Sequence, residues 1–106
     1  TQSLKIIEEI FEPNAEYYKK TYAPPLKGIE QIKKYWKEEI LHQRNVHIKI
    51  LRVAYAGNDI FAEWEATFAQ LKRKMQVKGV LIMSINPRSA RVQTLWEYYQ
   101  SRELKK

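Results

Sequence analysis

The sequence contains no cysteine, only two histidines and no long apolar run. Without cysteine, disulfides, thiolate zinc sites and cysteine nucleophiles are excluded. His42 and His47 have no further ligands at metal-binding spacing around them, so no metal site is expected, and no cofactor motif is present. No stretch approaches the ~20 apolar residues that a membrane helix needs, and no secretory signal is visible. We therefore expect a cytoplasmic protein without a membrane partner.

The composition is that of a globular protein with a basic surface. Hydrophobic residues make up 44% of the 106 residues and charged residues 29%, which predicts one domain over residues 1–106 with a single core. The net charge of +7 suits either a nucleic-acid partner or a well-solvated surface. Because the basic residues are spread over several segments and accompany no nucleic-acid motif, a nucleic-acid partner is not expected. These segments are 19–20, 33–34, 72–74 and 105–106.

The stretch from Asp59 to Phe68, DIFAEWEATF, alternates between apolar and mixed positions. Since successive side chains of a strand point to opposite faces, this pattern predicts a strand with one broad apolar face lining a core or pocket. The apolar face carries Ala62, Trp64, Ala66 and Phe68, and the other face carries Phe61, Glu63, Glu65 and Thr67.

The remaining pattern predicts helices first and strands afterwards. Apolar residues recur at helical spacing from Ser3 to about Phe11 and again over residues 29–41, with a short extended piece at 15–22. Four strands follow, with turns at Gly57 and Pro87. We expect them at residues 46–55, 59–71, 76–85 and 91–100. This order is typical of the α+β class, with N-terminal helices packed on a curved antiparallel four-strand meander that encloses a cone.

These features resemble the nuclear transport factor 2-like superfamily, specifically its SnoaL-like branch. The resemblance implies a cone-shaped barrel with a pocket between helices and sheet, and usually a dimer. Members include polyketide cyclases, steroid isomerases, dehydratases and transport factors, so the fold alone does not choose an activity. Members often place an Asp near the end of the last strand, where this chain has Gln100. The matching stretches are APPLKGIEQIKKYW (23–36), GNDIFAEWEATF (57–68), VKGVLIMSI (77–85) and LWEYYQ (95–100).

Strand phase indicates which side chains reach the pocket. If alternation is unbroken, Val92 to Tyr98 place their even-numbered residues on the pocket face, and Glu97 points away from it, as do Glu63 and Glu65. A β-bulge would invert this argument. The predicted pocket contains Tyr17, Trp36, Trp64, Phe68, Met83, Trp96 and Tyr98, with Tyr17 and Tyr98 as its polar groups.

The strand at 77–85 is apolar on both faces, whereas a small monomer should show one polar face. An exposed apolar patch usually marks an interface, so we expect a homodimer through the outer face of the sheet. The predicted interface residues are Phe61, Val80, Ile82, Leu95 and Tyr99.

Three functions are compatible with these patterns. The first is a pocket protein that binds an apolar small molecule as a homodimer. The second is an isomerase, cyclase or dehydratase acting on an apolar carbonyl compound, which requires a carboxylate or histidine in the pocket beside a tyrosine hydroxyl. The third is a basic domain that binds nucleic acid or an acidic partner with steep salt dependence.

Overall fold

The structure, a computed structural model, describes residues 2–40 and 42–104, so Leu41 at the predicted end of the second helix lies outside it. The fold is α+β, as the sequence predicts. No helix in the described ranges is long and apolar enough to cross a membrane. In chain order the elements are α1 (Gln2–Ile10), β1 (Phe11–Tyr18), β2 (Leu26–Lys27), α2 (Gly28–Tyr35), the π-helix η1 (Trp36–Ile40), β3 (Arg44–Ala56), β4 (Asp59–Gln70), β5 (Arg73–Asn86) and β6 (Arg91–Glu103).

The sheet has six strands in the order β2-β1-β6-β5-β4-β3, so the predicted four-strand meander is incomplete. It is also not closed into a barrel, because β2 and β3 form its two edges. β1 contains Pro13 and Asn14, two residues that favour a turn. It runs instead parallel to β6, with a register irregularity between Phe11 and Glu16 that accommodates the proline.

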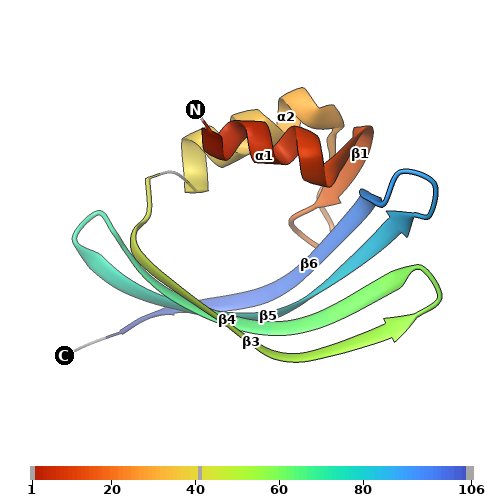
Figure 1. Cartoon of the computed structure of the whole chain (residues 1–106). Coiled ribbons are helices and arrows are strands. Elements are labelled where there is room, and N and C mark those ends of the chain that lie inside the picture. Colours follow the sequence, from red (N-terminus) through yellow and green to blue (C-terminus); the bar gives the residue numbers. More distant parts are fainter. Residues whose placement is uncertain (1, 41, 105–106) are drawn as a thin grey trace.

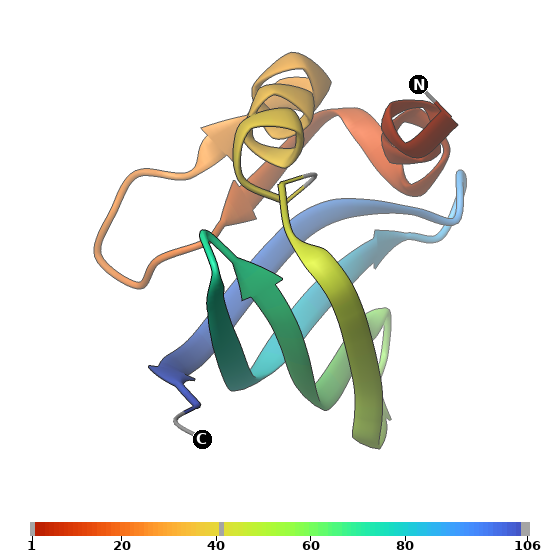
Figure 2. The same ribbon diagram turned by 90° about the vertical axis from the view of Figure 1, so that its left-hand side faces the viewer.

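Both helices lie on the concave side of the curved sheet (Figures 1 and 2). They pack mainly on β1, and α1 also reaches β6, which leaves the opposite side of the sheet bare. The apolar stripe of each helix, represented by Ile7 and Ile32, meets the inner faces of these two strands. The buried cluster between them consists of Ile7, Phe11, Ala15, Tyr17, Ile32, Val92 and Leu95.

A β-bulge near the start of β6 overturns the predicted phase of that strand. Ile85 pairs with Val92, but the preceding Ser84 pairs with Thr94, so Gln93 is an extra residue. Val92 faces the helices as predicted, and every side chain from Thr94 onward lies on the opposite face from the one expected. Odd-numbered residues from 95 onward therefore face the concave side.

Candidate functional site

A cavity of about 920 Å³ lies between the helices and the concave face of the sheet. Its wall is mainly apolar, because β4 presents the alternating face that contains Trp64, Ala66 and Phe68. Tyr35 of α2 and Trp36 of η1 line the cavity on the side of the helices. The helices and the sheet thus border an open site that is large enough for a small organic molecule.

The residues predicted for the pocket fall into three places. Tyr17, Trp36, Trp64 and Phe68 line the large cavity. Met83 faces the same side of the sheet but packs against the buried cluster instead of lining the cavity.

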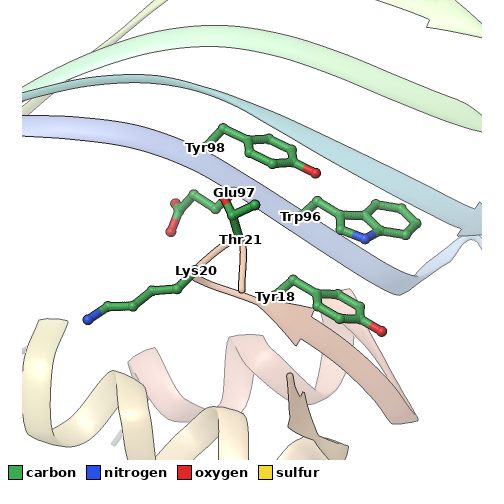
Figure 3. A pocket seen from close by; sticks show the side chains of 6 residues that line it. All are labelled: Tyr18, Lys20, Thr21, Trp96, Glu97 and Tyr98. Atoms are coloured by element: carbon green, nitrogen blue, oxygen red, sulfur yellow. The ribbon is translucent and has the colours of Figure 1, made fainter. Parts of the chain in front are cut away.

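Trp96 and Tyr98 do not line the large cavity, which corrects their predicted position. They line a smaller pocket of about 240 Å³ instead (Figure 3). The bulge at Gln93 is the physical reason, since it moves both side chains to the convex face.

The residues predicted for the dimer interface also divide into two groups. Phe61 pairs with Ile82 across β4 and β5, and both lie on the convex face with Val80. Leu95 and Tyr99 line the large cavity, so their predicted place on the outer face is wrong. The same bulge explains both errors on β6, because it exchanges the two faces of the strand after residue 93.

Because the bulge exchanges the two faces of β6, the side chain of Glu97 points into the cavity. It lies on β6 opposite Leu81 of β5, is half-buried, and leaves the strand away from the rings of Trp96 and Tyr98 (Figure 3). The Tyr17 hydroxyl donates a hydrogen bond of 2.7 Å to Oε1 of Glu97. Burial raises the pKa of Glu97, and the bond from Tyr17 opposes part of this rise. Glu97 is therefore an oriented carboxylate with increased basicity.

Phenol groups surround this carboxylate. Tyr35 lies edge-on to Tyr17, with ring centroids 5.7 Å apart, and burial together with the charge of Glu97 raises its pKa to about 12. Tyr99 lines the same cavity, and burial followed by the charge of Glu97 raises its pKa as well. Both phenols stay protonated at neutral pH and can donate hydrogen bonds to a ligand oxygen.

Glu63, Glu65 and the two histidines, the other acids and bases considered from the sequence, lie outside the cavity. On the convex face, Glu63 forms an ion pair with Arg52 at 2.6 Å, and Glu65 lies 4.0 Å from Lys78. These pairings agree with the expected role of both residues as surface carboxylates. His47 pairs with Thr67 in the sheet, and neither it nor His42 lines a cavity.

The smaller pocket forms where β1 ends. Tyr18 is the last residue of β1 and pairs with Trp96, against which its ring stacks at 5.9 Å. The following loop departs from β6, and Lys20 and Thr21 border the resulting gap (Figure 3). Lys20 and Glu97 line both this pocket and the large cavity, so the two spaces adjoin each other at the end of β1.

Two donors in the cavity wall are unpaired. The indole nitrogens of Trp36 and Trp64 are buried and have no hydrogen-bond partner among residues 2–40 and 42–104. Burying an unpaired donor costs about 1–3 kcal/mol. A ligand acceptor can relieve this cost only after a small shift of the rings, because solvent does not reach either nitrogen.

Alternation on β6 pointed to the wrong side chains, so Glu97 was missed along with the cavity positions of Leu95 and Tyr99. The sequence around Gln93 has no glycine or other residue that marks a bulge. The signal that could have found Glu97 is compositional: it is the one charged residue in the segment from Leu95 to Tyr99, which otherwise consists of leucine and aromatic residues.

Comparison with known proteins supports the fold. A candidate SnoaL-like polyketide cyclase from Jannaschia sp. CCS1 superposes with a TM-score of 0.80 at 14% identity, covering 92% of this chain and 72% of that one. The epoxide hydrolase/cyclase-like enzyme SalBIII, which has a role in pyran ring formation in salinomycin, gives 0.80 at 12% identity, with 94% and 81% covered. A protein from Catenulispora acidiphila with a ketosteroid isomerase-like fold gives 0.73 at 17% identity, with 86% and 70% covered.

At these identities the solved structures show a shared fold and nothing finer. No curated protein matches the sequence significantly. The family model of the SnoaL-like domain, however, matches residues 1–94, which is most of the chain. The resemblance seen in the sequence is thereby confirmed. The chain belongs to the SnoaL-like domain family, with the nuclear transport factor 2-like fold.

Proposed function

We propose that this protein catalyses proton transfer at the carbon next to a carbonyl group in an apolar small molecule, as an isomerase, cyclase or dehydratase does. The observation that carries the proposal is Glu97, which faces an apolar cavity and accepts a 2.7 Å hydrogen bond from Tyr17. A carboxylate beside phenol groups in such a cavity is the arrangement that this chemistry requires.

Each group has a distinct role in the proposed reaction. Tyr17 holds Oε1 of Glu97, and among the described residues no hydrogen bond reaches Oε2, which is left to meet the substrate. The carboxylate removes a proton from the carbon, and the electron pair of that bond moves toward the carbonyl oxygen. Tyr35 or Tyr99 donates a hydrogen bond to the developing enolate. In a substrate with a double bond conjugated to the enolate, Glu97 returns the proton to the far carbon of that system, which completes an isomerisation. In a substrate with a second carbonyl, the enolate carbon attacks that carbonyl and Glu97 gives its proton to the resulting alkoxide, which closes a ring.

The test is hydrogen–deuterium exchange of a panel of apolar ketones, beginning with tetralone, followed by NMR in deuterium oxide. The folded protein should accelerate loss of the signal from the protons beside the carbonyl, relative to buffer and to protein unfolded in urea. Because the base must be ionised, the rate should increase with pH and level off above the pKa of Glu97. That pKa lies above the ordinary value of about 4.3.

The alternative is a protein that binds an apolar molecule without transforming it. The mainly aromatic and aliphatic wall of the cavity favours this reading. Ketones that bind to the protein, as detected by quenching of tryptophan fluorescence, but show no accelerated exchange at any pH would contradict the enzymatic proposal and support the binding role.

We also propose that two copies associate through the convex face. Its centre carries the half-buried Phe61, Ile82 and Trp96, while Val80 and Tyr98 beside them are 39% and 44% exposed. Neither helix covers this face (Figure 1). A contiguous apolar patch of this kind is suited to a twofold contact with a second copy, in which each patch covers the other.

Ile82→Lys should dissociate this dimer, because a charged side chain would be buried at the centre of the patch. Sedimentation velocity should then show the monomer at concentrations where the original protein is dimeric. Thr67→Lys is the matched control, since it adds the same charge to the convex side of β4 away from the patch. A mass unaffected by Ile82→Lys would argue against this interface.

A further inference from the structure

Two lysines border the large cavity where the two spaces meet. β1 ends at Tyr18, so the chain leaves the sheet beside Glu97 and places Lys19 and Lys20 at this edge. Both lysines line the large cavity, and Lys20 also lines the smaller pocket. In Figure 3 the side chains of Lys20 and Glu97 extend toward the same side, away from the rings of Tyr18 and Trp96.

The cations around the cavity differ in how they are neutralised. Arg73, near the far end, lies 3.4 Å from Glu103. The Lys19 ammonium lies 4.4 Å from the centre of the Tyr35 ring, which is an attractive cation–π contact but adds no negative charge. No ion pair or hydrogen bond joins Lys20 to any residue in 2–40 or 42–104. Both lysines therefore remain uncompensated.

The carboxylates of the cavity do not cancel this charge. Glu39 lines the cavity but is exposed and forms no ion pair within the described residues. Glu97 is held by Tyr17 and, among the described residues, forms no ion pair with either lysine. The edge of the cavity near Lys20 consequently carries two ammonium groups that have no ion-pair partner among the described residues, beside a mainly apolar wall.

We infer that the natural ligand is an apolar molecule with one anionic group, such as a carboxylate, which binds the ammonium of Lys20 while the apolar body contacts Trp64 and Phe68. This inference deepens the proposed function and depends on its cavity as the ligand site. Lys20 is exposed, so solvent screens part of its attraction for an anion, but an ammonium at the edge of an apolar cavity still favours a ligand of opposite charge over a neutral one. The anionic group fixes which part of the ligand lies next to Glu97.

A pair of fluorescent probes tests this charge preference. Anilinonaphthalene sulfonate is anionic, and N-phenylnaphthylamine has the same rings without the sulfonate. Each is titrated into the original protein, Lys20→Met and Lys34→Met. Lys34 is an exposed residue of α2 outside both cavities, so its replacement removes the same charge from elsewhere. Displacement of one probe by the other establishes that they share a site.

Lys20→Met should weaken binding of the sulfonate probe by up to about fivefold, the upper end for an exposed ion pair, and should leave binding of the neutral probe unchanged. Lys34→Met should change neither. Equal weakening by both lysine variants would assign the effect to the overall charge of +7 and overturn the inference. The inference would also be overturned if Lys20→Met weakened binding of the neutral probe and of the anionic probe by the same factor. If neither probe binds the original protein, the cavity itself is not a ligand site and the proposed function fails with the inference.

Discussion

Glu97→Gln is expected to slow ketone proton exchange by roughly 10²- to 10⁴-fold, the usual contribution of a positioned general base. The amide has nearly the same shape as the carboxylate, and its oxygen can still accept the bond from Tyr17, which is 2.7 Å long in the structure. It has no basic oxygen that can take a proton from carbon. The residual rate should also lose the pH dependence that Glu97 imposes. NMR exchange measurements on the original protein and the variant provide the comparison.

Thermal unfolding of the same variant separates loss of chemistry from loss of folding. Burial raises the pKa of Glu97 in the folded state, so the folded chain holds this proton more tightly than the unfolded chain. Stability from this group is therefore lost as pH rises from the unfolded pKa to the higher folded pKa. Glu97→Gln should match the original protein at acidic pH and melt at a higher temperature at neutral pH.

The matched control for both measurements is Glu65→Gln, which removes a carboxylate from the convex face, where it lies 4.0 Å from Lys78. It should leave exchange unchanged. Full exchange activity in Glu97→Gln would remove Glu97 as the base. If Glu97→Gln melted at a lower temperature than the original protein at neutral pH, the carboxylate of Glu97 would stabilise the fold instead of destabilising it.

Gly79→Ala is expected to destabilise the protein by about 3 kcal/mol, at the upper end of the range for overpacking. Gly79 lies in the middle of β5, paired with Trp64 of β4 and Tyr99 of β6. A Cβ atom there would overlap the carbonyl oxygen of Tyr98 and lie 2.8 Å from Cβ of Tyr99. Backbone propensity alone would make alanine more stable than glycine in a strand, so the steric overlap is the reason that the substitution is expected to destabilise the protein. The melting temperature should fall by on the order of 15 °C.

Gly57→Ala provides the contrast, because it separates steric overlap from backbone strain. Gly57 lies in the β3–β4 turn with φ of +60°, and no atom lies within 4 Å of a Cβ added there. Its replacement should cost only about 1 kcal/mol, the penalty for a left-handed backbone conformation. Equal losses in the two variants, measured by urea denaturation, would mean that close approach of β6 to Gly79 is not what requires glycine.

The elements that repeat one pattern over many residues were predictable from the sequence. The alternation around Trp64 placed β4 and its inward face correctly, and it also placed Glu63 and Glu65 outside. Such a strand has one possible phase, because the wrong one would bury two carboxylates and expose a tryptophan. Helical spacing likewise identified the faces of α1 and α2 that carry Ile7 and Ile32 to the core.

The N-terminal strands were predicted only in part: the extended piece expected at residues 15–22 overlaps the second half of β1, whereas the first half of β1 and all of β2 were not expected. Pro13 and Asn14 are typical of a turn, and only pairing with β6 makes this segment a strand. Its neighbour along the sheet is remote in the sequence, so local propensity contains no information about it. The extra strands determine the site, since the end of β1 at Tyr18 places Lys19 and Lys20 beside Glu97.

The sequence by itself determined the class of fold, the apolar wall of the cavity and the family resemblance, because these depend on patterns that many residues repeat. Only the tertiary structure decided which carboxylate enters the cavity. One extra residue, Gln93, exchanges the faces of β6, bringing Glu97 inward and sending Trp96 and Tyr98 outward. A bulge depends on how two strands pack against each other. Because side chains in a strand alternate between two faces, one extra residue reverses the predicted face of every residue after it.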